Sequence, residues 1–144
     1  MSPRLNKEEA WEVLIAAHTG ILTTLKADGT PISLPMWFVV IDERVYVTTP
    51  ARAKKVGRVQ RNPRVSFLVE SGTRWVELEA VHLTGYARVV TDDEVRARVR
   101  NALDNKYAAF RTPGGDRNVD GVAMAIIEVT PDERMLTWDN TRHC

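Results

Sequence analysis

The sequence contains a single cysteine, Cys144, which is also its last residue. An internal disulfide and a cysteine metal cluster are therefore excluded, and this cysteine usage favours the cytoplasm as the location. No apolar run approaches the roughly 18 residues that a membrane-spanning helix needs. The opening segment MSPRLNKEEAWEVL is too polar for a signal peptide. We expect a cytoplasmic protein that does not bind membranes.

Net charge is also nearly absent, because 20 Lys and Arg residues are balanced by 19 Asp and Glu residues. Domains that bind nucleic acid usually have a strongly basic surface, so this balance argues against a nucleic-acid partner. The 144 residues suffice for one domain with a buried core. No repeat, linker or low-complexity segment divides the chain, and we expect a single domain over 1–144.

Familiar catalytic and metal-binding motifs are missing as well. The sequence has no G-x-G-x-x-G, P-loop, H-E-x-x-H or G-x-S-x-G pattern, and its three histidines lack the spacing of metal ligands. We therefore expect no metal site and assign no catalytic side chain. A chain without such motifs is typical of proteins in which a bound cofactor supplies the chemistry. Three side chains stay open as general acids: Tyr86, Lys106 and Tyr107.

What the sequence does contain is a regular alternation of apolar residues, which predicts mostly strands. Asp28-Gly29 is a strong hairpin signal, and a change of apolar phase predicts a bulge near Ala80. Sequential hairpins indicate an antiparallel barrel with helices outside it, a mainly β (α+β) fold. The expected helices are 6–18, 53–61 and 91–110, the last capped by Thr91, and 111–121 is expected to be a loop. The expected strands are 20–26, 31–40, 44–49, 64–70, 74–90, 122–130 and 134–138.

The strand expected at 31–40 is apolar on both of its faces. Leu34 and Phe38 lie on one face, while Pro35, Trp37 and Val39 lie on the other. A barrel strand has only one inward face, so its outer face must contact something else. A partner chain, a flat ligand or a covering helix would each satisfy this requirement.

A strongly basic run follows the strand expected at 44–49. Residues 52–64 contain six cations and no acid, although the whole chain has a formal charge of only +1. Thr48 and Thr49 end the strand directly before this run, so hydroxyls, helix N–H groups and cations are expected to converge. The pattern predicts a phosphate site, and a solvated helix face is the alternative.

These residues resemble a known family. The segments ILTTLKADGTPISLPMWFVV and RVYVTTPARAKKVGRVQRNPRVSFLV are similar to the split-barrel flavin-binding proteins of the pyridoxamine 5′-phosphate oxidase-like superfamily. The resemblance is good over residues 10–90 and looser elsewhere. It implies a split β-barrel with flanking helices that forms a homodimer, with two cofactor sites at the dimer interface.

The resemblance also implies which residues bind the cofactor. Lys54 stands where the family has Arg, and this difference weakens any bidentate phosphate contact. Trp138 is expected in the cofactor or substrate pocket, with core or dimer packing as the alternative. The residues expected to hold the phosphate are Thr48, Thr49, Lys54 and Lys55, with Arg52 as an added cation. The residues expected to back the cofactor ring are Ser33, Leu34, Pro35, Met36 and Trp37.

The cofactor itself is suggested by a narrower similarity, to the deazaflavin-dependent reductases that use coenzyme F420. The C-terminal Arg-x-x-Pro-like segment of true pyridoxamine phosphate oxidases is not found in MLTWDNTRHC. The resemblance therefore implies an F420-dependent oxidoreductase that transfers hydride to or from an unidentified small organic substrate. Two alternatives stay open: an FMN-dependent oxidase or reductase, and a non-catalytic protein that binds flavin, deazaflavin or haem.

Overall fold

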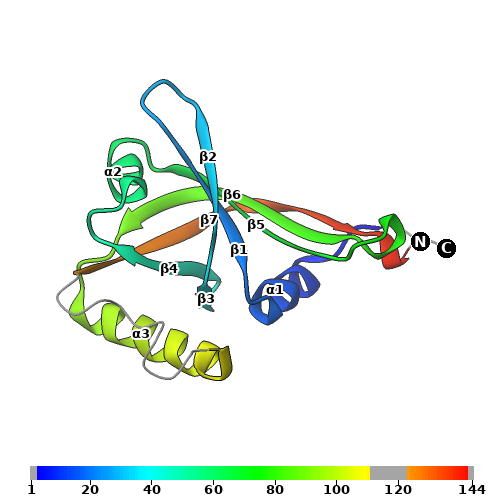
Figure 1. Cartoon of the computed structure of the whole chain (residues 1–144). Helices are drawn as coiled ribbons and strands as arrows, with labels where there is room; N and C mark the ends of the chain where they lie inside the picture. Colours follow the sequence, from blue (N-terminus) through cyan, green and yellow to red (C-terminus); the bar gives the residue numbers. More distant parts are fainter. Residues whose placement is uncertain (1–2, 111–122, 143–144) are drawn as a thin grey trace.

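The computed structural model describes residues 3–110 and 123–142, and the segment 111–121, His143 and Cys144 lie outside these ranges. In the described chain, a seven-stranded antiparallel sheet with the order β2-β1-β5-β6-β7-β4-β3 curls into a split barrel (Figure 1). The strands are β1 Gly20–Leu25, β2 Pro31–Met36, β3 Phe38–Ile41, β4 Arg44–Pro50, β5 Arg64–Ser71, β6 Glu79–Val89 and β7 Met124–Asp139. The α-helices are α1 Lys7–Ala16, α2 Lys54–Arg61 and α3 Asp93–Tyr107, and the 3₁₀ helices are η1 Trp75–Glu77, η2 Ala108–Phe110 and η3 Asn140–Arg142.

Two tight turns join neighbouring strands as the sequence predicts. Gly29 has a φ of +87°, and the Asp28 side chain accepts a hydrogen bond from Thr30 N–H at 2.9 Å, which closes the β1–β2 hairpin. Asp42 and Glu43 join β3 to β4 with φ values of 52° and 56°. Positive φ at both central residues matches the right-handed twist of the strands that the turn connects.

The strand predicted at 31–40 is interrupted. It divides at Trp37 into β2 and β3, which occupy opposite edges of the sheet. The bend is required by the barrel, because one continuous segment must leave the β1 side and pair with β4, where Phe38 lies opposite Val47. The prediction of a single strand was therefore wrong at this point.

The C-terminal half differs from the prediction in three places. The two expected strands 122–130 and 134–138 form one strand, β7, which runs through Pro131 because it pairs with β6 over nearly its whole length. The bulge lies between Leu83 and Gly85 instead of near Ala80. A side chain at Gly85 would come within 2.3 Å of Thr130 O, so the close approach of β7 requires glycine there. Residues 75–77 form η1 instead of extending β6.

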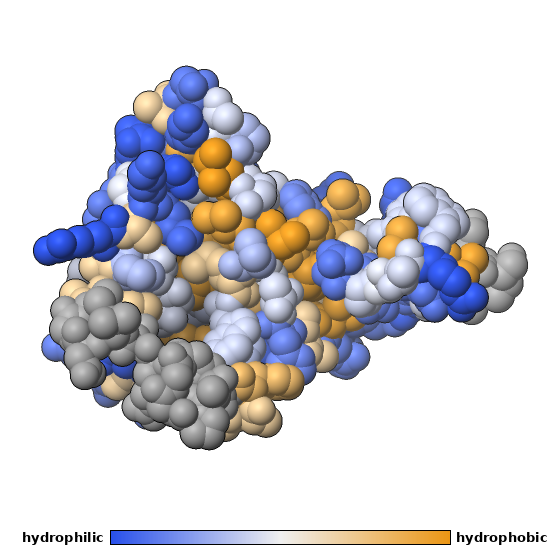
Figure 2. Space-filling view, in the orientation of Figure 1, coloured by the Kyte–Doolittle hydropathy of each residue, from blue (hydrophilic) through white to orange (hydrophobic). Residues whose placement is uncertain are grey.

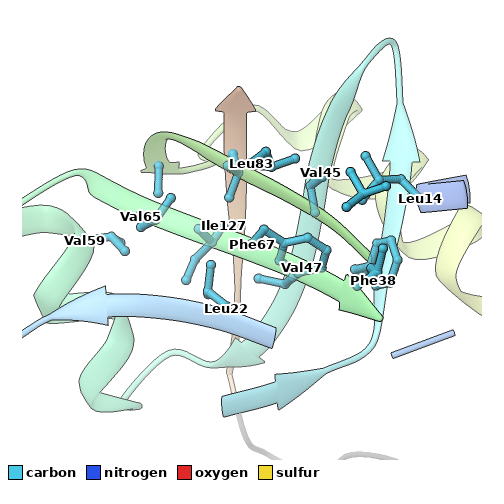
Figure 3. Packing of buried hydrophobic residues seen from close by; sticks show 14 of the residues in the cluster. Leu14, Leu22, Phe38, Val45, Val47, Val59, Val65, Phe67, Leu83 and Ile127 are labelled. Carbon is cyan, nitrogen blue, oxygen red and sulfur yellow. The ribbon is translucent and has the colours of Figure 1, made fainter. Parts of the chain in front are cut away.

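The barrel interior holds the main core, to which α1 and α2 add side chains (Figure 3). Phe38 and Phe67 meet edge to face at 4.8 Å near its centre. Helix α1 begins with a capping box, in which the side chains of Asn6 and Glu9 each accept a hydrogen bond from the other residue's backbone N–H. Helix α3 is capped by Asp92 and not by Thr91. Val56 and Val59 of α2 are buried against the barrel.

Helix α3 covers the outer face of one part of the sheet. Val39, Tyr46 and Ile126 are buried beneath it together with Val99 and Leu103. A covering helix, one of the three explanations that the sequence left open for this apolar face, therefore accounts for Val39.

The rest of the outer face has no described element packed on it. Pairing places Pro35, Ile21, Leu68, His82 and Leu136 in one row across β2, β1, β5, β6 and β7, and we call this row the open face. Leu136 is 70% exposed. Figure 2 shows hydrophobic side chains exposed across the middle of the molecule.

Candidate cofactor site

The predicted phosphate residues gather where β4 ends and α2 begins. Helix α2 starts with Lys54 and Lys55, its N-cap residue Ala53 makes no side-chain cap bond, and its first turn contains no acid. Helix N-termini expose unpaired N–H groups and a partial positive charge, so two lysines there are locally unfavourable. An anion bound at this end would relieve the repulsion and use the N–H groups.

Lys55 and Thr49 form the contact at the centre of this group. The Lys55 ammonium donates to Thr49 Oγ1 at 3.3 Å. Partial burial, and then the charge of Arg58 one turn along the helix, lower the pKa of Lys55. Thr49 is almost completely buried, so Lys55 is the member of the pair that a ligand would reach.

The other predicted phosphate residues are less tightly assembled. Thr48 follows the alternation of β4, so its side chain lies on the opposite face of the strand from Thr49 and is half-buried. Arg52 and Lys54 are exposed beside the start of α2. The structure thus joins Thr49 to Lys55, leaves Arg52 and Lys54 exposed, and directs Thr48 to the other face of β4.

The predicted ring-backing segment, residues 33–37, forms most of β2 and the bend after it. Ser33 and Pro35 lie on the open-face side and pair with Thr23 and Ile21 of β1. Met36 packs against the core from the other side, and Leu34 is 42% exposed. Trp37 stands at the bend, where its indole lies parallel to the Tyr107 ring at 4.2 Å.

Helix α3 holds this bend through two side chains that the sequence could only offer as candidates. Tyr107 Oη accepts from Phe38 N–H at 2.9 Å and can donate to His18 O at 2.8 Å or to Phe38 O at 2.9 Å. Lys106 donates to Phe38 O at 3.0 Å, and burial lowers its pKa to about 8. Their spacing on α3 gave no signal of this role, because it depends on where α3 packs.

Trp138 lies far from the other predicted residues of the same chain. It pairs with Ala80 near the end of β7, whereas Thr49 pairs with Ala125 at the beginning of that strand. At about 3.3 Å per residue, thirteen residues of strand span roughly 40 Å. Figure 1 shows α2 and the C-terminal end of strand β7 on opposite sides of the molecule. One chain therefore cannot bring Trp138 and Lys55 to the same flavin.

The described residues form neither a metal cluster nor a membrane-spanning helix. No cluster of three or more His, Cys, Asp or Glu side chains in 3–110 and 123–142 could hold a metal ion. None of the helices built from these residues is long and apolar enough to cross a membrane.

Comparison with solved structures supports the fold. A conserved hypothetical protein, Rv2991 from Mycobacterium tuberculosis, is 28% identical with a TM-score of 0.82, over 98% of this chain and 91% of that one. An FAD-binding protein from Mesorhizobium loti is 20% identical with a TM-score of 0.74, over 92% and 94% of the two chains. An F420 reductase is 23% identical with a TM-score of 0.67, over 87% and 94%.

A comparison of the sequence itself identifies the family. No curated protein matches the sequence. The family model described as pyridoxamine 5′-phosphate oxidase matches residues 7–136, which include most of the split barrel, the predicted phosphate residues at the start of α2 and the predicted ring-backing segment. The chain therefore belongs to the pyridoxamine 5′-phosphate oxidase family.

Proposed function

We propose that this protein is an oxidoreductase that binds coenzyme F420 in a homodimer and acts on a small organic substrate. The observation that carries the proposal is the contact between Lys55 and Thr49 at the uncapped, acid-free start of α2. This arrangement fits the phosphate group that FMN and F420 share. When bound, either cofactor would supply hydride-transfer chemistry, for which the protein needs few catalytic side chains of its own.

The choice of F420 over FMN rests on the cations beyond Lys55. Arg58 and Arg61 continue along α2 at intervals of three residues, and both side chains belong to its last turn. One phosphate does not need this row, whereas the longer anionic tail of F420 could contact it. An FMN-dependent enzyme is the runner-up, because Lys55 and Thr49 would serve it equally well.

The homodimer is supported by the position of Trp138. If Trp138 contacts the cofactor, the distance along β7 requires that it come from a second copy of the chain. Trp138 is 44% exposed and its neighbour on the open face, Leu136, is 70% exposed. A second copy that covers these side chains would bury them and bring Trp138 to the other chain's site.

The test is a pair of titrations of the purified protein, one with FMN and one with F420, followed by absorbance and fluorescence. A charge-assisted hydrogen bond contributes about 1.5–3 kcal/mol, so Lys55→Ala should weaken the binding of either cofactor by about 10- to 150-fold. Arg61→Ala is the matched control for FMN, because Arg61 is exposed and at the far end of the helix. Arg61→Ala should lower the affinity for FMN only a few-fold, and high salt should remove that loss because it screens exposed charges.

Three results would reject the proposal in whole or in part. Equal losses of FMN affinity in Lys55→Ala and Arg61→Ala, both erased by salt, would mean that α2 is a diffuse basic patch without a phosphate site. Tighter binding of FMN than of F420, with Arg58→Ala affecting neither, would replace F420 by FMN. Cofactor binding without turnover on a panel of substrates would support a non-catalytic binding protein instead.

A further inference from the structure

Two side chains at the end of α3 bond the backbone of Phe38, the first residue of the edge strand β3. Phe38 N–H donates to Tyr107 Oη at 2.9 Å, and Phe38 O accepts from Lys106 Nζ at 3.0 Å. Tyr107 Oη also lies 2.9 Å from Phe38 O. The Phe38 carbonyl therefore has two donors within reach, and one of them is an amine that can lose its charge.

The Tyr107 hydroxyl has a second acceptor, His18 O, at 2.8 Å. A hydroxyl has a single proton, so Tyr107 donates fully to either His18 O or Phe38 O and not to both. Burial raises the pKa of Tyr107, so the hydroxyl keeps this proton at neutral and mildly alkaline pH. The two acceptors differ in what can replace Tyr107. His18 is exposed, so water can bond its carbonyl, whereas Phe38 is completely buried.

The charge of Lys106 affects which carbonyl is the better acceptor for Tyr107. Hydrogen bonds from a charged donor are roughly twice as strong as those between neutral groups. An ammonium ion at Lys106 occupies Phe38 O and favours donation from Tyr107 to His18 O. A neutral amine is a weaker donor and favours donation from Tyr107 to Phe38 O. The ammonium also lies 3.9 Å from the centroid of the Phe38 ring and 5.3 Å from that of Tyr107, and both attractions weaken when its charge is lost.

The surroundings of Lys106 contain other titratable groups, which have partners of their own. Asp42 pairs with Arg98 at 3.2 Å, and Tyr46 donates to the buried Glu128 at 2.8 Å. Burial is the cause that lowers the pKa of Lys106 to about 8. The titratable side chains on α3 and on the segments around it are His18 before β1, Asp42 in the β3–β4 turn, Tyr46 of β4, and Arg98, Asp104 and Tyr107 of α3.

We propose that Lys106 is a positioning residue, whose charge selects the carbonyl to which Tyr107 donates and thereby couples the start of β1 and the bend at Trp37 to pH. While Lys106 is charged, α3 holds Phe38 and His18 together. When Lys106 gives its proton to water, Tyr107 turns to Phe38 O and His18 O is hydrated instead. Trp37 follows, because its indole stacks on the Tyr107 ring at 4.2 Å.

The exchange should also affect the cofactor, and this step rests on the proposed function. Trp37 ends the predicted ring-backing segment, and a site that is less firmly held in advance binds its ligand less tightly. Neutral Lys106 should therefore weaken cofactor binding, although its side chain has no assigned contact with the cofactor. Lys106 would then act on the site through Tyr107 and Trp37.

The test is NMR of the purified full chain, without cofactor, between pH 6.5 and 9.5. The amides of Thr19 and Val39 directly follow the two competing carbonyls, so their ¹⁵N shifts report on hydrogen bonds to His18 O and Phe38 O. The chain has four tryptophans, and Trp37→Phe assigns the Trp37 signal of 5-fluorotryptophan-labelled protein by removing it. We expect the Thr19, Val39 and Trp37 signals to move together, with a midpoint near 8.

Two variants fix the charge of Lys106 in opposite states. Arginine stays charged over this pH range, so Lys106→Arg should hold the Thr19 signal at its low-pH position throughout. Lys106→Met has no donor and should hold the Thr19 signal near its high-pH position. Lys26→Arg, an exposed residue after β1, is the control and should leave the wild-type midpoint unchanged. If Lys106→Met fails to fold, Lys106→Arg still decides, because its signals stay constant only if Lys106 is the titrating group.

The outcomes keep this inference apart from the proposed function. Constant Thr19 and Val39 signals in the wild type, or a wild-type transition in Lys106→Arg, would overturn the exchange. Between pH 7 and 9.5 the wild type should lose about 3-fold more affinity for FMN than Lys106→Arg loses, and equal losses would overturn the positioning role. If neither FMN nor F420 binds at pH 7, the proposed function fails, and the NMR titration still decides whether the exchange occurs.

Discussion

The indole of Trp37 lies flat against the phenol ring of Tyr107, with centroids 4.2 Å apart and planes that differ by 7°. The stack joins the bend between β2 and β3 to the C-terminal turn of α3. The same tyrosine accepts a hydrogen bond from the buried Phe38 N–H, so one side chain supports the bend by both stacking and hydrogen bonding.

Removal of the Tyr107 hydroxyl should therefore destabilise the fold while leaving the stack in place. Tyr107→Phe leaves Phe38 N–H buried without its partner, which costs about 1–3 kcal/mol. The melting temperature should fall by about 3–10 °C. Tyr86→Phe is the control, because Tyr86 is 55% exposed, and it should change the melting temperature by less than about 2 °C. Equal melting temperatures for the two variants would show that the hydroxyl does not support the bend.

Lys106 should titrate at an unusually low pH. Burial lowers its pKa to about 8 from the ordinary lysine value of 10.5, so its charged form is disfavoured in the folded protein. The folded protein therefore gains stability as the pH rises from about 8 toward the pKa of lysine in the unfolded chain. It loses this stability again as the pH falls back to about 8. Reductive ¹³C-methylation followed by NMR should show one dimethyl-lysine resonance with a midpoint near 8, which is absent in Lys106→Arg. A midpoint above 10 would contradict this assignment.

Two neighbouring glutamates should respond in opposite directions to neutralisation. Burial and the nearby Asp139 raise the pKa of Glu79, whereas hydrogen bonds from Arg74 lower the pKa of Glu77. The fold therefore favours the protonated form of Glu79 over the ionised form. The stability gained from the protonated form is complete below the pKa of the unfolded chain, near 4.5, and it is lost as the pH rises through the pKa of the folded protein. Glu79→Gln should raise the melting temperature at pH 7–8, and this gain should vanish near pH 4.

Glu77→Gln supplies the matched comparison. In the wild type, the Glu77 carboxylate accepts hydrogen bonds from the backbone N–H groups of Thr73 and Arg74, which lower its pKa. The ionised carboxylate therefore stabilises the fold at pH values above the pKa of glutamate in the unfolded chain. Glu77→Gln should lower the melting temperature slightly at neutral pH, with no loss in acid. Calorimetry across pH 4–8 measures both variants, and shifts of the same sign in both would refute the opposing assignments.

The open face should mediate association. Light scattering should give the mass of a dimer, and Leu136→Glu should weaken it at least about 10-fold by placing a charge in the buried apolar contact. Ile15→Glu changes an exposed residue of α1 that lies outside the open-face row, and it should leave the dimer intact. A wild-type chain that stays monomeric at high concentration with cofactor bound would remove the basis for the two-chain site.

Features that depend on neighbouring residues could be predicted from the sequence, and those that depend on packing could not. The Asp28-Gly29 hairpin and the helix that begins after Asn6 are local features, and the structure has both. Thr49 and Lys55 are also close in sequence and are in contact, and the phosphate role of the group from Thr48 to Lys55 stays a prediction. The division at Trp37 and the continuity of β7 through Pro131 depend on which strands pair. His18, Pro35 and Glu70 are distant in sequence, so only the order β2-β1-β5 shows that they line one cavity.

Strand β2 also affects how the chain avoids unwanted association. It is an edge strand whose described neighbour is β1, and it contains Pro31 and Pro35. Alternate residues direct their N–H groups to the same side, and a strand paired with β1 tolerates these prolines only if their nitrogens face the unpaired side. That side offers few donors to a foreign strand, which makes this edge a poor template for amyloid-like growth. Pro35, which belongs to the ring-backing segment, and Pro31 before it thus also protect the barrel from adding strands at its rim.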